Sequence, residues 1–454
     1  MKKAFKMDEI DAAVDKFNPV TPDHPFYTDF KNLRGDFQER EVMRILNVRK
    51  AEGKYVFNYK ANQQNKTLLF LAGMRGSGKT SELAKYAQLL HTPGCFFVVT
   101  CNVDEELDMD NVQYMDILIF QLEKLLQRAD KANLKLSDDI LESMNKWFED
   151  RVLEINKSLK ADGSAEIEVS PDESFSMAGL FGRLLGITGK LKFGLSGSYE
   201  RANTIRTNFK NRFVDFSVKF NTFIEQTNEQ LRREYQGKEV LFIVDGLEKT
   251  MSGDTRRKII MEESNRIRQI KANTIFTLPI ELMKEEQRIR NFSEIITFPF
   301  IKVRDRDGSL VEEAVERFEE FVSKRVSEEL FDSKSTIHLA IQYSGGSPRQ
   351  LLRIIEQASW QVESGQEIIT EANMMKAINR LGNSMARFLE PSDFETLKTL
   401  KKALGAGEPI GFDSTIQNLL EKEIIFEYND GTYKRVNPLL EVSKLYQHHM
   451  KEGA

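Results

Sequence analysis

The fold of this chain is constrained most by residues 73–80, which read Gly-Met-Arg-Gly-Ser-Gly-Lys-Thr and match the pattern G-x-x-x-x-G-K-[ST] at every fixed position. The preceding residues 66–72 predict a buried strand, and residues 82–90 predict a helix. A glycine-rich loop between a strand and a helix lets backbone N–H groups surround a phosphate at the helix N-terminus, where the peptide dipoles favour an anion. The sequence therefore predicts an α/β fold with a nucleotide site.

The loop assigns individual residues to the expected site for ATP and Mg²⁺. The Lys79 ammonium group can reach the outer phosphates and take part in catalysis, and the Thr80 hydroxyl can hold Mg²⁺. The residues expected to bind the nucleotide are Gly73, Arg75, Gly76, Ser77, Gly78, Lys79, Thr80 and Ser81.

A second motif ends another apolar run. Residues 239–244 predict a buried strand, and Asp245-Gly246-Leu247-Glu248 follows it. In this Walker B arrangement Asp245 would orient Mg²⁺, usually through water, and Glu248 would polarise the attacking water. The alternative is a buried strand that ends in an Asp-Gly turn. The complete phosphate-binding loop upstream favours the catalytic interpretation.

A third motif lies at residues 344–353. Two glycines predict a turn, Ser347 suits an N-cap and Pro348 suits the first helical position, so Arg349 falls in the first turn of a helix. A cation there gains nothing from the helix dipole. We therefore expect Arg349 to reach a nucleotide phosphate and to act in catalysis.

Further apolar runs at residues 95–100, 273–279 and 295–298 complete the expected parallel sheet. Either Asn273 or Thr277 could sense the γ-phosphate, and the sequence leaves that choice open. The wide separation of the loop from Asp245 predicts a helical insertion at about 105–235.

Part of this insertion, residues 160–200, has five glycines between 178 and 194, which argue against a long stable helix. We expect a packed segment with strand or hairpin character, and a surface for a partner or a membrane is the alternative. Residues 201–234 return to a helical pattern. Their basic side chains Arg201, Arg206, Lys210 and Arg212 predict a solvated face, with phosphate contact as the alternative.

The 454 residues are too many for one core and predict about two to four domains. The formal net charge of −5 gives no global basic field for nucleic acid. No signal peptide or membrane-spanning window is visible, so we expect a cytoplasmic protein without a transmembrane segment. Cys95 and Cys101 lie too far apart on one predicted strand for a disulfide and are expected to be buried thiols.

Together these motifs resemble the AAA+ and STAND branch of P-loop ATPases. Residues 76–83 are similar to the loop of a group of bacterial ATP-binding proteins, and residues 245–248 resemble the STAND and NACHT form. Gly246 stands where AAA+ proteins have a catalytic glutamate, and Lys249 where NACHT proteins often have a further acid, which implies slow turnover. Residues 344–353 resemble a helical-lid motif, which implies that Arg349 is its sensor 2 arginine.

The C-terminus predicts helices at 394–404 and 414–420 and a hairpin at 424–436. This order resembles a winged-helix domain. Its basic side chains Lys422, Lys434 and Arg435 are offset by neighbouring acids, so protein packing is favoured over DNA binding. The expected fold is an α/β P-loop NTPase of the ASCE/AAA+ type, with an adaptor segment at 1–50, an ATPase domain at 51–300, a helical lid at 301–388 and a winged helix at 389–454.

Three functions fit these features. The favoured one is an ATP-driven switch that controls self-assembly or a partner effector, and the bacterial relatives imply signalling or defence against phage. A DNA-associated AAA+ loader or remodeller is the alternative, and an inactive nucleotide-binding scaffold is the third. A homo-oligomeric ring would also need an arginine finger from a neighbouring subunit, for which the candidates are Arg288, Arg290, Arg304 and Arg325.

Overall fold

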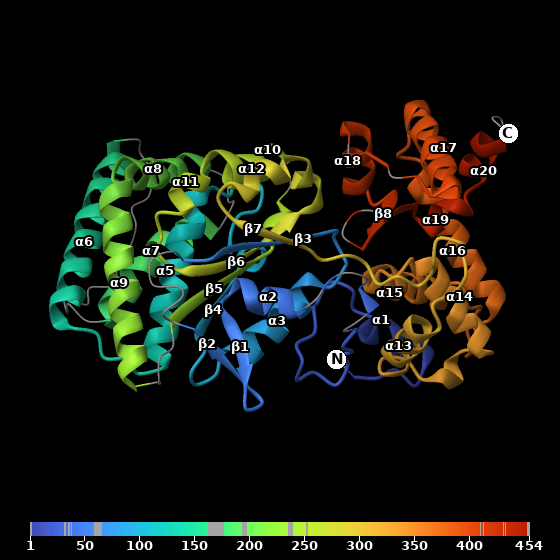
Figure 1. Cartoon of the computed structure of the whole chain (residues 1–454), viewed down its shortest axis with the longest axis horizontal. Coiled ribbons are helices and arrows are strands. Elements are labelled where there is room, and N and C mark those ends of the chain that lie inside the picture. The colour runs from blue at the N-terminus through green and yellow to red at the C-terminus, as the bar shows by residue number, and fades with distance from the viewer. Residues whose placement is uncertain are drawn as a thin grey trace.

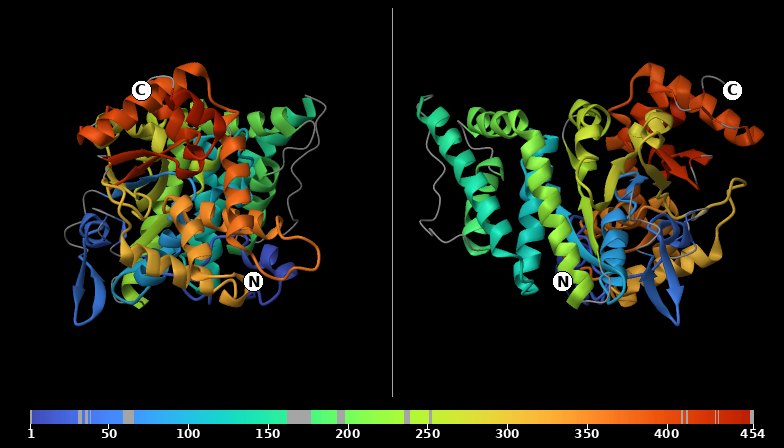
Figure 2. Two further views of the ribbon diagram at one scale, coloured as in Figure 1. Left: turned by 90° about the vertical axis from the view of Figure 1, so that its right-hand side faces the viewer. Right: turned by 60° about the vertical axis from the view of Figure 1, so that its left-hand side comes forward.

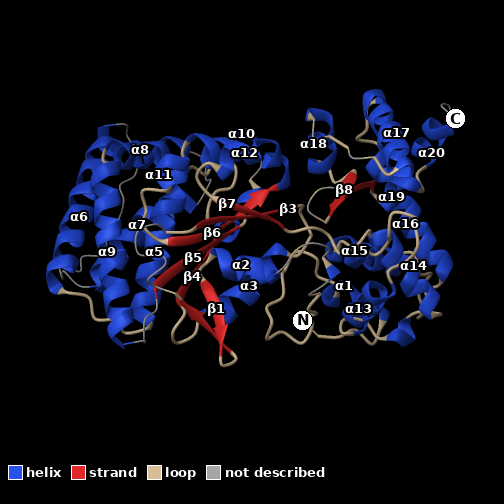
Figure 3. Ribbon diagram, viewed as in Figure 1, coloured by secondary structure: helices blue, strands red, loops and turns tan. Residues whose placement is uncertain are grey.

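The computed structural model describes residues 2–30, 33–34, 37, 39–58, 66–161, 177–192, 198–234, 239–250, 253–408, 410–411, 413–429, 431 and 433–451. They form an elongated molecule with a sheet near its middle, the helices of the insertion at one end and the C-terminal helices at the other (Figure 1). Figure 3 shows the strands gathered in the central sheet and in short hairpins.

The central sheet has five strands: β3 (Leu68–Gly73), β4 (Phe96–Asn102), β5 (Glu239–Asp245), β6 (Asn273–Pro279) and β7 (Glu294–Thr297). Their order is β4-β5-β6-β3-β7, and every neighbouring pair is parallel. The register pairs Gly73 with Pro279 and Asn102 with Asp245, so the strands end along one edge. The strands predicted from apolar runs are confirmed, and β6 separates β3 from β5.

Both faces of the sheet are buried, which explains the continuous apolar runs. On one face Leu69 and Leu71 pack with α2 (Glu39–Ile45) and α3 (Lys79–Leu90). On the other, Phe70 and Phe242 pack with α5 (Tyr114–Lys131) and α9 (Phe213–Glu234). The two cysteines are buried free thiols on β4 and just before it, as the sequence predicts.

The expected helical insertion lies between β4 and β5. It consists of α4 (Val103–Glu106), α5, α6 (Asp138–Ala161), α7 (Met177–Lys192), α8 (Ser198–Asn211) and α9. Figure 2 shows its long helices standing as a bundle beside the sheet. The bundle and that face of the sheet share one hydrophobic core.

The expectation for residues 160–200 was wrong where the structure describes them, because α7 is a continuous helix of 16 residues. Its buried apolar side chains are Leu180, Leu184, Ile187 and Leu191, at helical spacing against α5 and α6. Each glycine costs about 1 kcal/mol in a helix, whereas each buried aliphatic side chain contributes about 1.5–3 kcal/mol. Tertiary packing therefore overrides the glycine content. Residues 162–176 and 193–197 lie outside the described residues.

The prediction of a solvated basic face was also wrong for Arg206, which is buried in the insertion. Its Nη2 lies 2.7 Å from Oδ2 of Asp116 on α5. Both side chains are only 2% exposed, so the pair ties α8 to α5 within the core. Lys210, on the same helix, donates to Oε1 of Gln113 at 2.6 Å.

Short elements complete the part of the chain around the sheet. They are the hairpin β1 (Val48–Ala51) and β2 (Lys54–Phe57), then η4 (Leu247–Lys249), α10 (Gly253–Arg257), the π-helical turn η5 (Lys258–Glu262), α11 (Ser264–Ile267), η6 (Ile280–Glu285) and α12 (Glu286–Arg290).

The C-terminal half packs around two further cores. The first core joins α13 (Glu312–Ser323), η7 (Glu328–Leu330), α14 (Lys334–Ser344), α15 (Pro348–Ser359) and α16 (Glu371–Ala386) with η1 (Met7–Glu9) and α1 (Ile10–Ala13) from the N-terminus. The second joins α17 (Pro391–Ala406), α18 (Ser414–Glu421), β8 (Ile425–Tyr428), β9 (Tyr433–Val436), α19 (Pro438–Glu441) and α20 (Lys444–Lys451). The helix, helix and hairpin expected from the sequence are therefore present.

Candidate functional site

The phosphate-binding loop joins β3 to α3 at the edge of the sheet where the strands end. Gly78 is the N-cap of α3 and has φ 98°, a left-handed conformation that favours glycine. A Cβ at this residue would also lie 3.1 Å from Nη2 of Arg34. The helix therefore begins at Lys79, with its first backbone N–H groups directed into the loop.

Lys79 is buried in this loop and fully occupied by partners. Its Nζ donates to the carbonyl oxygens of Gly73 and Met74, at 2.9 Å each, and lies 3.4 Å from Oε1 of Glu248. The side chain is 3% exposed. An ammonium group has three protons, so contact with a phosphate requires Lys79 to exchange one of these partners.

The two acids of the second motif lie beside the loop and have opposite pKa shifts. Burial and the charge of Glu248 raise the pKa of Asp245 to about 6, although a hydrogen bond from Thr80 opposes the shift. Burial also raises the pKa of Glu248, but Lys79 and a hydrogen bond with Thr277 outweigh it, so the net shift is downward. Glu248 is therefore ionised at neutral pH.

The turn after Asp245 depends on a glycine. Gly246 has φ 97°, and a Cβ there would lie 2.2 Å from Oδ1 of Asp104 on α4. Asp104 forms an ion pair with Lys249. The turn thus places Glu248 on η4, pointing back toward the loop, and leaves no space for a side chain at the position where AAA+ proteins have a glutamate.

The chemistry of this corner fits Mg²⁺ and a phosphate. Three buried oxygen atoms at this corner have no hydrogen-bond partner among the described residues: Ser77 Oγ, Asp245 Oδ1 and Glu248 Oε2. Mg²⁺ prefers oxygen ligands and usually takes only one or two from carboxylates. Thr80 and Asp245, which are hydrogen-bonded to each other, could hold it together with phosphate oxygens.

Of the two residues that the sequence offered as a phosphate sensor, Thr277 lies at the site and Asn273 does not. The backbone N–H of Gly246 donates to Thr277 Oγ1 at 3.1 Å, and the hydroxyl also bonds to Glu248. Asn273 is at the other end of β6, where its Oδ1 accepts from the backbone N–H of Thr67 at 3.0 Å.

The third motif folds as expected and brings Arg349 to the loop. Ser347 is the N-cap of α15, and its Oγ accepts from the backbone N–H of Gln350 at 3.2 Å, with Pro348 at the first helical position. A Cβ at Gly76 would lie 3.0 Å from Cβ of Arg349. The first turn of α15 therefore packs directly on the phosphate-binding loop.

Two arginines near the loop have structural partners. Nη2 of Arg75 donates to the carbonyl oxygen of Glu248 at 2.8 Å, so its side chain fastens the loop to η4. Arg34 was not predicted; its Nη1 donates to the carbonyl oxygen of Pro299 at 2.8 Å, and its Cζ lies 3.9 Å from the ring centroid of Phe298. Burial lowers the pKa of Arg34 to about 10.

A cavity of about 120 Å³ opens over the loop. Its lining includes Gly76, Gly78, Lys79, Thr80 and Ser81 from the loop and α3, Arg325 and Arg349 from the C-terminal helices, and residues 15–20. No motif in this N-terminal segment indicates that it reaches the site. A larger cavity, of about 930 Å³, lies at the amino ends of the strands. Ligands of parallel α/β sheets bind at the carboxyl ends, so the smaller cavity is the candidate site.

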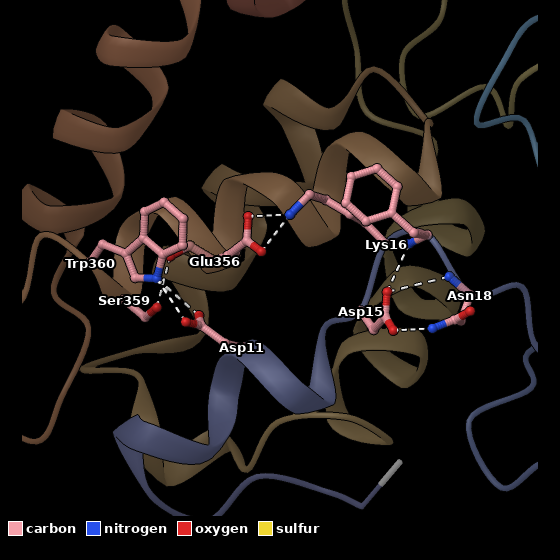
Figure 4. Close-up of polar contacts among 8 residues, drawn as sticks. Asp11, Asp15, Lys16, Asn18, Glu356, Ser359 and Trp360 are labelled. Carbon is pink, nitrogen blue, oxygen red and sulfur yellow. Dashed lines mark hydrogen bonds and ion pairs between the residues drawn. The ribbon is translucent and has the colours of Figure 1, made fainter. Parts of the chain in front are cut away.

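The N-terminal segment is fastened to α15. Figure 4 shows Lys16 directed at Glu356, with Nζ 2.5 Å from Oε1, and the Trp360 indole directed at Asp11. The indole Nε1 donates to Oδ1 of Asp11 at 3.0 Å. The segment that lines the cavity is therefore tied to the helix that carries Arg349.

The C-terminal hairpin unit, residues 391–451, also contacts the edge of the sheet. Arg256 on α10 lies between Glu281 on η6, at 2.6 Å, and Glu421 on α18, at 2.5 Å. On the hairpin itself, Lys434 is buried against Glu427 at 3.2 Å. Helix α18, the candidate recognition helix in the DNA-binding alternative, thus contacts the protein through Glu421.

Within the described ranges, no group of three or more histidine, cysteine, aspartate or glutamate side chains is arranged to hold a metal by itself. No helix in the same part of the chain is long and apolar enough to cross a membrane.

The fold is of the mixed α/β class, and its parallel sheet is consistent with a P-loop NTPase. No protein-family model matches the sequence, and no curated protein matches it either. Among solved structures, the chain is similar to the Walker-type ATPase paby2304 of Pyrococcus abyssi. The match has a TM-score of 0.39 and 12% sequence identity, and covers 92% of this chain and 98% of that chain.

Proposed function

We propose that the protein binds ATP with Mg²⁺, hydrolyses it slowly, and uses the nucleotide state to control its own assembly or a partner protein. The observation that carries this proposal is the convergence of Lys79, Thr80, Asp245 and Glu248 at the carboxyl edge of a parallel sheet, with buried oxygen atoms left without partners.

Each residue has a role that its surroundings support. The loop N–H groups and Lys79 bind the outer phosphates, and Thr80 and Asp245 hold Mg²⁺, which would supply positive charge to the phosphate oxygens. Glu248, ionised because Lys79 lowers its pKa, accepts hydrogen bonds from the attacking water. Arg349 reaches the phosphates from α15.

The contacts of Glu248 support slow turnover. This carboxylate is paired with Lys79 through Oε1 and bonded to Thr277, so its contacts restrict how it can orient water. The contact of Arg256 with Glu421 supports a switch, because it links the edge of the sheet to the C-terminal hairpin unit. The Lys434–Glu427 pair supports protein packing rather than DNA binding by that unit.

Calorimetry with ATP and Mg²⁺ tests the proposal. We expect wild-type protein to bind ATP and Lys79→Ala to lose at least about tenfold in affinity, the equivalent of one charge-assisted contact. Lys402→Ala, an exposed change on α17, is the matched control. Mass measurement with and without ATP tests assembly. A wild-type protein that binds no nucleotide would rule out the proposal.

A further inference from the structure

Arg325 follows α13 and is fixed there by its neighbours. Its Cζ lies 3.7 Å from the ring centroid of Phe321 and 5.2 Å from that of Phe26. Its Nη1 donates to the carbonyl oxygen of Phe321 at 2.9 Å, and its own carbonyl oxygen accepts from the backbone N–H of Ala4 at 2.8 Å. The packing therefore gives the guanidinium group a defined position.

This guanidinium group is buried without a carboxylate partner among the described residues. Arg325 is 4% exposed, and burial lowers its pKa to about 9 with no contribution from an acid. Arg206 and Arg256 are equally buried, but each has a carboxylate partner: Asp116 at 2.7 Å and Glu281 at 2.6 Å, respectively. A buried cation without a counter-charge is unfavourable. The structure of Arg325 is thus suited to an anion that comes from outside the chain.

The place for that anion is the cavity over the phosphate-binding loop, which Arg325 lines together with Lys79. Two other cations of this cavity are already paired, Lys79 with Glu248 and Lys249 with Asp104. Arg325 is buried in this lining without a carboxylate partner among the described residues, whereas Arg349 is only half-buried and Arg75 donates to the carbonyl oxygen of Glu248.

We propose that Arg325 donates hydrogen bonds to the phosphate groups of the nucleotide bound in its own chain. This inference rests on the proposed function and assigns one more phosphate contact to the same site. A guanidinium group suits this task because its planar N–H groups match pairs of phosphate oxygens. Arg325 and the loop line one cavity of one chain, so the contact is made in cis. Arg288 and Arg290 have side chains 65% and 48% exposed and remain candidates for a finger in trans.

Arg325→Met tests the contact, because it removes the charge and keeps an unbranched side chain against Phe321. We expect its affinity for ATP to fall about tenfold to a hundredfold, and its affinity to depend less on salt, since an ionic contact is lost. The melting temperature without nucleotide is expected to stay the same or rise, because an uncompensated charge leaves the interior. A purely structural role would instead lower the melting temperature and leave ATP affinity unchanged, and that result would overturn the proposal.

Arg317→Met is the matched control, since Arg317 lies on α13 with its side chain 42% exposed. If Arg325→Met does not fold, Arg325→Lys is measured; it keeps the charge but loses the planar fork, and unchanged ATP affinity would overturn the proposal. If the wild type and Arg317→Met bind no ATP, the proposed function itself fails. If both bind and Arg325→Met binds equally well, only the role of Arg325 fails.

A mixing experiment tests the assignment in cis. Arg325→Met retains the loop, and Lys79→Ala retains Arg325, so a contact made between subunits would restore ATP binding in a mixture of the two. We expect no restoration beyond the sum of the separate proteins. Restored binding would overturn the assignment in cis.

Discussion

Nζ of Lys79 lies 3.4 Å from Oε1 of Glu248. The cation proposed to bind phosphate and the carboxylate proposed to orient water therefore form an ion pair. Both groups are buried, at 3% and 6% side-chain exposure. Each of the two buried charges thus has a counter-charge within the protein. Under the proposed function, a phosphate that attracts Lys79 would weaken this ion pair, so ATP binding would be coupled to the freedom of Glu248 to orient water.

Glu248→Gln is expected to keep ATP binding and to lower hydrolysis by about 10²–10⁴-fold, the range typical of a lost general base. The amide cannot hold a proton from water, and Lys79 is no longer held by an ion pair, so affinity for ATP should stay equal or increase. Phosphate release and calorimetry on the same sample measure the two effects. Glu395→Gln, on the surface of α17, is the control; hydrolysis unchanged in Glu248→Gln would remove this residue from catalysis.

Asp245 predicts a pH dependence of stability in the nucleotide-free protein. Its pKa is about 6 when folded against 3.8 as the reference, so between pH 4 and 6 the folded state binds more protons than the unfolded state. Stability therefore falls as pH rises through this window, by about 3 kcal/mol if the full shift is expressed. Asp245→Asn should be more stable than wild type above pH 6 and lack this loss, which urea unfolding at pH 5 and pH 7.5 would show. Equal pH profiles for the two proteins would contradict the assignment.

Addition of ATP and Mg²⁺ should reverse the loss of stability at higher pH in the wild type, because Mg²⁺ supplies a positive counter-charge for the Asp245 carboxylate. Asp245→Asn should show a much smaller stabilisation by the same addition. Melting temperatures measured with EDTA as the control compare the two.

Arg256→Ala is expected to destabilise the protein by about 3–5 kcal/mol, because it leaves the buried carboxylate of Glu281 unpaired. Its neighbour Arg257 has a side chain 40% exposed and pairs with Glu262 at the surface, so Arg257→Ala should cost less than about 1 kcal/mol. Urea unfolding gives both values. Limited proteolysis should cut residues 391–451 faster in Arg256→Ala; equal cutting in the two variants would exclude the contact as a tether.

Gly246→Ala should destabilise the protein and abolish hydrolysis. The left-handed backbone alone costs about 1–2 kcal/mol for a residue with a Cβ, and here that Cβ would also displace Asp104 from Lys249. Gly308 has a similar φ of 90° and open space around it, so Gly308→Ala isolates the backbone cost. Phosphate release and urea unfolding of the two variants give the comparison, and equal effects would mean that the Asp104 contact is unimportant.

The sequence predicted those parts of the site that depend on local patterns. The phosphate-binding loop, Asp245 at a strand end and Ser347 as an N-cap are each recognisable within a few residues, and the structure places them as expected. The choice of Thr277 over Asn273 needed the strand order, since only the parallel register shows which end of β6 meets the loop.

Features that depend on contacts between distant segments could not be predicted. Helix α7 forms because Leu180 and Leu184 are buried against neighbouring helices, which outweighs its glycines. Residues 15–20 reach the cavity because the N-terminal segment packs on α15, and Arg325 reaches it from the end of α13. Nothing in the local sequence around these residues indicates that they lie beside the phosphate-binding loop. The domain boundaries and the winged-helix interpretation stay predictions.

The attachment of the N-terminal segment has a consequence for synthesis on the ribosome. Lys16 is made before its partner Glu356, which lies 340 positions later. At a synthesis rate of about 5–20 residues per second, α15 is made tens of seconds after the phosphate-binding loop. The cavity is therefore completed only after α15 has left the exit tunnel.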